Sequence, residues 1–286
     1  VKFPLLFTYT QFDNRVGKFI KISSICREPS FLGYILAPAL CLIVCYYYAP
    51  EYINKNSAMF CRRYEFALIV IAYILTFSGV AYFGMVVMLV IIWYKKRPSL
   101  KKLALPLFLA VLCILTYLYI PDIRLRIDDT LRVFTASNVQ SASINLSSYT
   151  YYANFLVVQR TVMATLGMGS GLGSYPIMFD KYNNVKWGGS GISLNREDAN
   201  SGFFRILAEI GVVGILVTFG FIFRYFPRRK SDKIGYSIAI AALFIMFLLR
   251  QGNYTHAGSV LFIIMYIKNY KEVMKNVQGE KDWNCS

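Results

Sequence analysis

Long apolar segments, rather than any single motif, most constrain the fold of this chain. A helix that crosses a bilayer perpendicularly needs ~20 apolar residues, and shorter helices are tolerated beside longer neighbours. Hydrophobic residues make up 56% of the 286 residues, whereas soluble domains contain ~45–50%. The sequence therefore predicts an all-α polytopic membrane protein, a single membrane domain over residues 1–286 with about seven spans. The expected spans are 31–48, 64–77, 80–94, 103–120, 203–226, 234–249 and 258–267.

The basic residues predict how these spans are oriented. The net charge is +16, and the lysines and arginines are scattered through the loops, a distribution that argues against nucleic acid as a partner. Because basic loops face the cytoplasm, all four basic clusters are expected on that side of the membrane. The clusters are Lys55, Arg62 and Arg63; Lys95, Lys96, Arg97, Lys101 and Lys102; Arg228, Arg229, Lys230 and Lys233; and Lys268, Lys271, Lys275 and Lys281.

This orientation requires an even number of spans between neighbouring basic clusters. The apolar stretch 64–94 is therefore predicted to form two short helices that turn near Ser78. Segments 1–30, 120–202 and 250–257 then face outward, which in a bacterium is the periplasmic side of the inner membrane. The periplasmic loop 121–202 is longer than an ordinary connection, so we expect it to be functional. Since the chain begins with Val1 and shows no signal-peptide pattern, we expect further spans to precede it.

Cysteine and histidine usage gives little reason to expect a metal site. The six cysteines show no C-x-x-C spacing, and we interpret them as small apolar fillers. His256 is the single histidine, so no zinc ligand set is predicted. We expect neither a metal nor another cofactor.

Arginines on the outward face need an explanation other than orientation. They include Arg27, Arg160, Arg196, Arg205 and Arg250. Arg205 and Arg250 lie within apolar segments, where a charge costs ~2.5–3.5 kcal/mol on insertion scales, so both are candidates for function. Arginine is suited to phosphate because its fork donates two parallel hydrogen bonds. The alternative is ordinary loop ion pairs, for instance between Arg126 and Asp128 or Asp129.

The stretch "LNREDANSGFFRILAEIGVVG", residues 194–214, gathers polar groups directly before an apolar helix. Asp198, Asn200 or Ser201 is predicted to cap that helix. Arg205 and Glu209 have i,i+4 spacing and share one helical face. The amino terminus of the helix points outward, and its dipole favours an anion there.

Glycines alternate upstream of this stretch, in "GMGSGLGSY". Gly167, Gly169, Gly171 and Gly173 do not form the dinucleotide-binding pattern G-x-G-x-x-G. Successive backbone amides in such a run can form an anion nest. A plain flexible turn is the favoured interpretation.

These motifs together resemble a known family. "GSGLGSY" followed by "LNREDANSGFFRILAEIGVVG" looks like the second half of Wzy-type O-antigen and polysaccharide polymerases, which belong to the O-antigen ligase/polymerase superfamily. "REPSFLG", "LTFSGVAYFG" and "LLRQGNY" are similar to further family patterns, and the resemblance covers roughly residues 27–267. It implies a GT-C-like helical bundle. The implied reaction joins undecaprenyl-diphosphate-linked oligosaccharide repeat units into O-antigen, capsule or exopolysaccharide at the periplasmic face, without metal.

The resemblance also implies roles for individual residues. Arg160, Arg196, Arg205 and Arg250 become candidates for binding the lipid diphosphate, and Asp198, Glu197 or Glu28 for the base that deprotonates the acceptor hydroxyl. Other expected substrate-binding residues are Arg27, Asn200, Ser201, Asn253 and Tyr254. Implied partners are the lipid bilayer, a chain-length regulator and a flippase.

Two other functions remain open. Ligases of the superfamily, which transfer glycan to lipid A core, usually carry a His-Asn pair where this chain has Asn200-Ser201. This departure favours a polymerase and removes the obvious histidine base. A transporter or flippase of lipid-linked sugars is the third interpretation. Transporters often show repeated halves, whereas no internal repeat is visible here.

Overall fold

The computed structural model describes residues 15–16, 19–20, 29–54, 63–76, 78–95, 111, 117–119, 121–135, 146–184, 194–227, 231–254 and 258–283. Apart from a short antiparallel pair, β1 (Arg15–Val16) and β2 (Phe19–Ile20), the elements of this part of the chain are helices. The all-α class predicted from the apolar segments is therefore confirmed. The chain divides into two compact units, where the sequence suggested one domain. Unit 1 contains residues 1–106, 222–246 and 257–286, and unit 2 contains residues 107–221 and 247–256.

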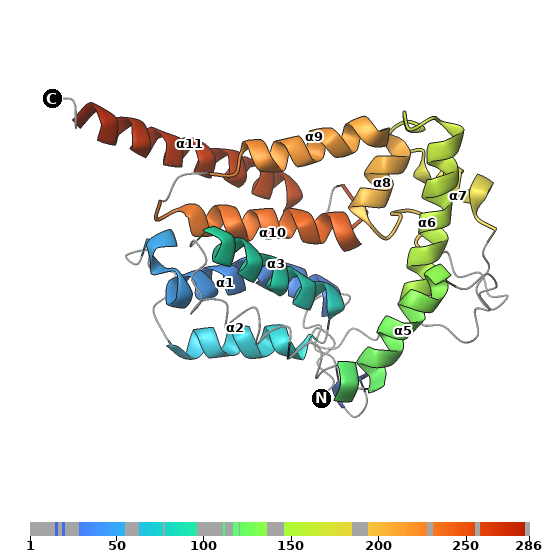
Figure 1. The fold of residues 1–286 in the computed structure, drawn as a ribbon, viewed down its shortest axis with the longest axis horizontal. Helices are drawn as coiled ribbons and strands as arrows, with labels where there is room; N and C mark the ends of the chain where they lie inside the picture. The colour runs from blue at the N-terminus through green and yellow to red at the C-terminus, as the bar shows by residue number, and fades with distance from the viewer. Residues whose placement is uncertain are drawn as a thin grey trace, which may run out of the picture. The chain divides into compact units, whose positions relative to one another are not determined.

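Unit 1 is built from helices that lie side by side, and all of them except α11 (Ser259–Trp283) are apolar along most of their length (Figure 1). They are α1 (Pro29–Tyr48), α2 (Arg63–Leu75), α3 (Gly79–Lys95), most of α10 (Ile234–Arg250) and α11, with a short 3-10 helix η1 (Pro50–Tyr52) after α1. Small residues allow close approach of the helices. A Cβ on Gly33 would lie 2.5 Å from the Ala81 Cβ, and one on Gly84 would lie 2.3 Å from the Met246 Sδ.

The stretch 64–94 forms two helices, as the charge argument predicted. α2 ends at Leu75, and α3 begins at Gly79. The Ser78 carbonyl accepts a hydrogen bond from the Tyr82 backbone amide at 3.0 Å, and the Ser78 hydroxyl accepts one from the Ala81 amide at 3.5 Å. Ser78 therefore starts α3 by satisfying amides of its first turn.

Length and composition identify one membrane-length helix among the described residues, Ser30–Tyr48. Four shorter apolar helices accompany it, at Tyr64–Leu75, Gly79–Lys95, Gly211–Arg224 and Ile234–Arg250. Each corresponds to part of an expected span. Most of the expected span 103–120 lies outside the described residues.

Basic residues from two of the clusters predicted to face the cytoplasm contact other elements of unit 1. The Lys95 ammonium donates to the Pro227 carbonyl at 2.6 Å. The Lys233 ammonium lies 2.5 Å from the Glu272 carboxylate of α11. Lys95, at the end of α3, therefore contacts the residue Pro227 that follows α9, and Lys233, just before α10, contacts the middle of α11.

Unit 2 surrounds the long helix α6 (Leu146–Ala164), against which α7 (Tyr175–Tyr182) and α8 (Gly202–Glu209) pack. Before it comes α5 (Pro121–Thr135), so much of the expected loop 121–202 is helical (Figure 1). α6 buries Tyr149, Ala153 and Val157, an i,i+4,i+8 stripe. Polar Asn154 and Thr161 are buried beside and beyond this stripe. Polar residues occur throughout α6, so the helix does not appear as an apolar segment in the sequence.

The expected continuous span 203–226 is interrupted, which corrects the sequence prediction. α8 ends at Glu209, and α9 (Gly211–Arg224) begins two residues later. Gly211 has a φ of +79°, in the left-handed region. A Cβ there would lie 2.2 Å from the Gly167 carbonyl oxygen. The break therefore depends on a glycine that packs tightly against the upstream glycine run.

Candidate functional site

The amino terminus of α8 is fixed by Ser201. Its backbone is extended, and its hydroxyl accepts a hydrogen bond from the Phe204 amide at 3.3 Å. The same hydroxyl donates to the Leu248 carbonyl at 2.7 Å. Ser201 is thus the predicted helix cap and also ties α8 to the end of α10. The sequence suggested that Ser201 binds substrate. In the structure its hydroxyl proton is donated to the Leu248 carbonyl, which is a contact within the protein.

Arg205 is held from three sides, one turn into α8. Its Nε lies 3.1 Å from the Glu209 Oε1, and its Nη1 donates to the Gly252 carbonyl at 3.0 Å. The guanidinium also lies over the Tyr254 ring, 4.5 Å from the ring centroid. Among the described residues, the Arg205 Nη2 has no hydrogen-bond partner. The guanidinium is therefore fixed in place with one donor edge available.

Glu209 is the carboxylate that organises this site, and its side chain is fully buried. Its Oε1 accepts hydrogen bonds from the Arg205 Nε and from the Tyr175 backbone amide at 3.3 Å, while Oε2 has no partner among the described residues. Tyr175 is the first residue of α7, so the anion at this helix terminus is the protein's own carboxylate. The sequence pointed to the Arg205 pair but not to Glu209 as a site residue.

The glycine run wraps around the end of α8. Gly167, Gly169, Gly171 and Gly173 all have φ between +76° and +104°. The Ser170 amide donates to the Ala208 carbonyl at 2.9 Å, and the Gly171 amide donates to the Glu209 carbonyl at 2.8 Å. These amides satisfy carbonyls that the end of α8 leaves without helical partners. The run thus acts as a cap for α8, and the Ser170 and Gly171 amides are not available to an anion nest.

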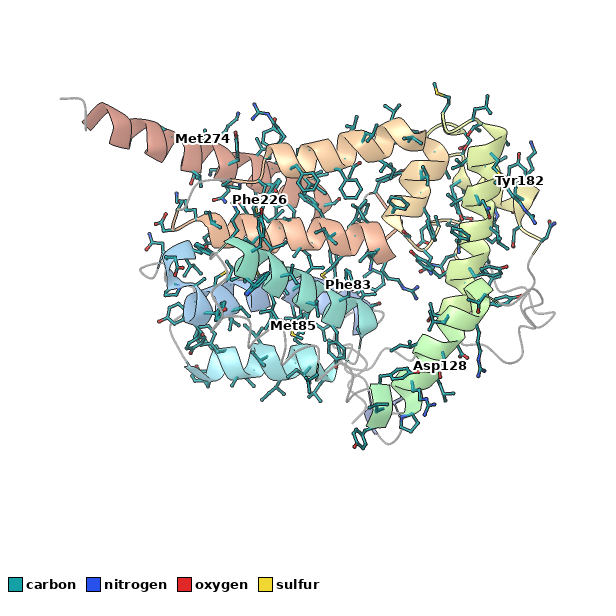
Figure 2. All side chains as sticks on the ribbon, in the orientation of Figure 1. Phe83, Met85, Asp128, Tyr182, Phe226 and Met274 are labelled. Atoms are coloured by element: carbon teal, nitrogen blue, oxygen red, sulfur yellow. The ribbon has the colours of Figure 1, made fainter. Side chains whose placement is uncertain are left out.

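Arg160 lies on α6 and is half-buried. Its Nη1 donates to the Tyr182 carbonyl at 2.6 Å, at the end of α7, where Tyr182 is labelled in Figure 2. In the part of the chain that the structure describes, no carboxylate pairs with Arg160. Its positive charge is therefore not compensated by an ion pair among the described residues.

Arg196 occupies a different environment from Arg205. Its Nε and Nη2 form a bidentate pair with both carboxylate oxygens of Asp180, at 2.7 and 2.6 Å, and its Nη1 pairs with Glu197. The hydrogen bond from Arg196 lowers the pKa of the Asp180 carboxyl. The cluster is solvent-exposed, with 57% exposure for the Asp180 side chain. Asp180 is a partner that the sequence did not reveal, because it lies on α7, outside the polar stretch.

Asp198 folds the polar stretch that precedes α8. Its Oδ1 accepts hydrogen bonds from the Asn195 side-chain amide at 2.9 Å and from the Asn200 backbone amide at 3.0 Å. Asn200 has a φ of +56°, which asparagine tolerates better than most residues. Its side chain is buried, and its Nδ2 has no partner among the described residues.

The segment after α10 lines the other side of Arg205. Tyr254 is half-buried, and burial, followed by the neighbouring Glu209 carboxylate, raises the pKa of its hydroxyl. Asn253 is exposed. Arg250, the last residue of α10, lies close enough to Tyr151 to offset part of the rise that burial causes in the pKa of that phenol.

The remaining predicted site residues, Arg27 and Glu28, lie outside the described residues, as does His256. Within the described ranges, no group of three or more His, Cys, Asp or Glu side chains is placed to hold a metal ion.

In comparisons with known proteins, no family model, no curated protein and no solved structure matches the chain.

Proposed function

We propose that this protein is a multi-pass glycosyltransferase of the bacterial inner membrane that polymerises lipid-diphosphate-linked oligosaccharide repeat units at the periplasmic face. The observation that carries the proposal is Arg205, fixed near the amino terminus of α8 with one donor edge available. A preorganised cation of this kind stabilises charge without having to reorganise during the reaction. The motif resemblance supplies the substrate class.

In the proposed reaction, an acceptor sugar hydroxyl attacks the anomeric carbon of the growing chain. The bond from that carbon to the diphosphate oxygen breaks, the lipid diphosphate leaves, and the configuration at the carbon inverts. Arg205 and Arg160 stabilise the negative charge that develops on the leaving group. Arg160 contributes a charge that no described carboxylate compensates, whereas Arg205 shares its charge with Glu209.

The acceptor proton requires a base, and the geometry favours Asp198 over Glu197. Two hydrogen bonds hold the Asp198 Oδ1, and among the described residues its Oδ2 remains available as a proton acceptor. Glu197 is exposed and is paired with Arg196. General-base catalysis needs a positioned acceptor within hydrogen-bond reach of the proton. The two hydrogen bonds give Asp198 that fixed position.

Arg205→Lys tests the proposed function in the native host. Lysine keeps the positive charge beside Glu209 but loses the planar fork, so we expect surface glycans to shorten towards single repeats while membrane protein levels persist. Arg124→Lys, on exposed α5, is the matched control and should leave the chain length unchanged.

The surface glycan pattern also separates the alternatives. Single repeats on the surface lipid indicate that transport and ligation proceed while polymerisation fails. Loss of all surface glycan, with polymer retained on the lipid carrier, would instead assign a ligase. Accumulation of repeats on the cytoplasmic side would assign a transporter. Glycans of normal length in the Arg205→Lys strain would remove Arg205 from the proposed site.

A further inference from the structure

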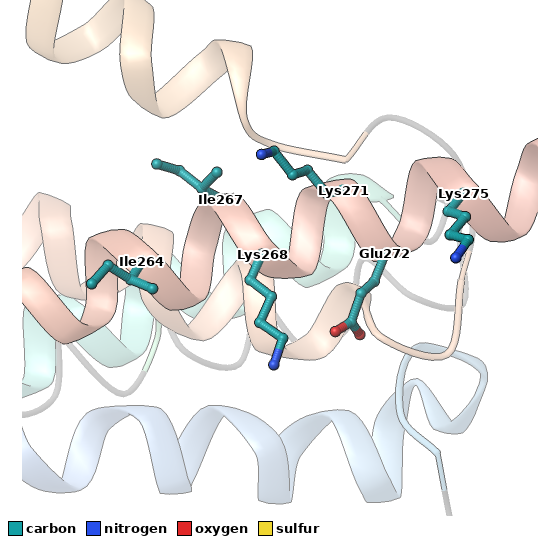
Figure 3. Close-up of a pocket in the computed structure, with 6 residues that line it drawn as sticks. All are labelled: Ile264, Ile267, Lys268, Lys271, Glu272 and Lys275. Atoms are coloured by element: carbon teal, nitrogen blue, oxygen red, sulfur yellow. The ribbon is translucent and has the colours of Figure 1, made fainter.

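One face of α11 changes from apolar to basic along the helix (Figure 3). A shallow hollow of about 500 Å³ follows this face. The residues that line it are Ile264, Ile267, Lys268, Lys271, Glu272 and Lys275, which we call the α11 stripe. Their spacing follows the i,i+3,i+4 pattern of a single helical face. At ~1.5 Å per residue, the stripe is roughly 17 Å long.

The α11 stripe carries a positive charge that its own acidic residue does not neutralise. Glu272 lies 2.5 Å from the Lys233 ammonium, and the hydrogen bond from that ammonium lowers the pKa of the Glu272 carboxyl. Glu272 therefore stays ionised and compensates Lys233. The three lysines of the stripe are exposed and form no ion pair with any described residue.

Other basic residues of unit 1 lie near the same stretch of α11. The Arg224 guanidinium donates to the Tyr270 hydroxyl at 3.2 Å. The Asn269 side chain donates to the Lys233 carbonyl at 3.0 Å. Lys233 is compensated by Glu272, so Arg224 is the residue that adds positive charge beside this stretch of α11.

The amino-terminal end of α11, which precedes the lysines, is apolar and exposed. Val260, Leu261 and Ile264 have exposures of 66%, 57% and 57%. A water-soluble acidic partner would gain contact with the lysines but would leave these side chains in water. A phospholipid presents both chemistries in one molecule, an anionic headgroup joined to apolar chains. The order of residues along α11 matches that arrangement.

We propose that the α11 stripe binds an anionic phospholipid of the cytoplasmic leaflet. The phosphate-containing headgroup contacts the three lysines, and the acyl chains lie along Ile264 and Ile267. This inference goes beyond the proposed reaction but rests on the membrane embedding that the proposed function requires. In α11 the three lysines directly follow residues 258–267, the segment that the sequence predicts to cross the membrane. Basic residues in that position are attracted to anionic lipid, each contributing roughly fivefold in affinity.

The test measures which lipids accompany the full chain. The protein is reconstituted into vesicles of mixed phosphatidylcholine and phosphatidylglycerol and released in detergent, and the bound lipids are quantified by mass spectrometry. We expect phosphatidylglycerol to be enriched over its share in the vesicle. The triple variant Lys268→Gln, Lys271→Gln, Lys275→Gln should lose that enrichment by about tenfold or more.

Two control variants test whether the enrichment depends on the α11 stripe itself, rather than on the total charge of the protein or on its folding. The three lysines replaced by arginine should retain the enrichment, because the positive charge is kept. Arg124→Gln, Arg132→Gln and Lys181→Gln together remove the same charge from exposed positions in unit 2 and should also retain it. Equal enrichment in the lysine-to-glutamine variant would overturn the lipid site while leaving the membrane embedding intact. A chain that enters neither pure phosphatidylcholine nor mixed vesicles would overturn both.

Discussion

An ion pair contacts helix α7 at each of its two ends, and one of these pairs is buried whereas the other is exposed to solvent. At its amino terminus, the buried Glu209 carboxylate accepts from the Tyr175 amide while pairing with Arg205. Near its carboxyl end, the exposed Asp180 carboxylate pairs with Arg196. The geometry of each pair is good, but the surroundings differ. Solvent and salt screen the exposed pair, whereas the buried pair is screened much less.

The difference indicates which arginine suits a diphosphate. Arg196 faces two carboxylates, Asp180 and Glu197, so its local cluster has a net charge of +1 − 2 = −1. Arg205 faces one described carboxylate, which gives a neutral pair in a protected position. A negative exposed cluster repels a diphosphate. We therefore infer that Arg196 fixes the polar stretch to α7, and that Arg205 is better suited than Arg196 to the proposed anion.

Removing the buried carboxylate should have the largest effect. Glu209→Ala leaves the largely buried Arg205 without its ion partner and the Tyr175 amide without its acceptor. Breaking a buried pair in this way destabilises proteins by ~3–5 kcal/mol. Thermal unfolding of the detergent-purified chain, followed by circular dichroism, should show a clear drop in midpoint.

The double variant Arg205→Met, Glu209→Leu serves as the control for this prediction. Replacing both partners by apolar residues avoids an uncompensated buried charge, so its midpoint should lie nearer to that of the original chain. A single Glu209→Ala variant with an unchanged midpoint would show that the buried pair does not hold the site together.

The next largest effect concerns the glycine at the break between α8 and α9. Gly211→Ala places a Cβ 2.2 Å from the Gly167 carbonyl and forces a left-handed backbone on alanine. Such strain costs about 1–3 kcal/mol before the clash is counted. Gly220→Ala is the matched control in the same helix, because nothing lies within 4 Å of its added Cβ. Alanine there should stabilise the helix by about 0.5–1 kcal/mol.

Limited proteolysis provides the measurement for this pair of variants. Gly211→Ala should expose the glycine run 166–174 to cleavage, and Gly220→Ala should not. Equal resistance of the two variants would mean that the run does not depend on its contact with the α8–α9 break.

The contacts that could be predicted from sequence are those set by local spacing. The i,i+4 pair of Arg205 and Glu209 and the cap at Ser201 follow from helix geometry alone, and both are present. The two helices on either side of Ser78 followed from charge and apolar length.

The missed features depend on contacts between distant segments. Gly211 lies in an apolar run that gives no sign of a break, and only the packing of Gly167 against it makes the left-handed conformation necessary. The Glu209 contact with Tyr175 joins residues 34 positions apart, and the Arg196 contact with Asp180 joins residues 16 apart. Periodicity contains no information about such pairs.

The smallest effect should come from the exposed pair. Asp180→Asn removes a solvent-exposed partner of Arg196, and Glu197 still pairs with that arginine. Surface pairs contribute little and are weakened by salt. Because Arg196 lowers the pKa of the Asp180 carboxyl below its ordinary 3.8, its contribution is fully present above pH 3.8. It is lost as pH falls through the lowered folded-state pKa.

The midpoint of Asp180→Asn should therefore match that of the original chain at neutral pH in high salt. At low salt it should fall only slightly below, and the difference should vanish in acid. A large, salt-independent loss at neutral pH would place Asp180 in the same class as Glu209. The carboxyl end of α7 would then be held as firmly as its amino end. Arg196 would again be a candidate for binding the diphosphate, as the sequence predicted.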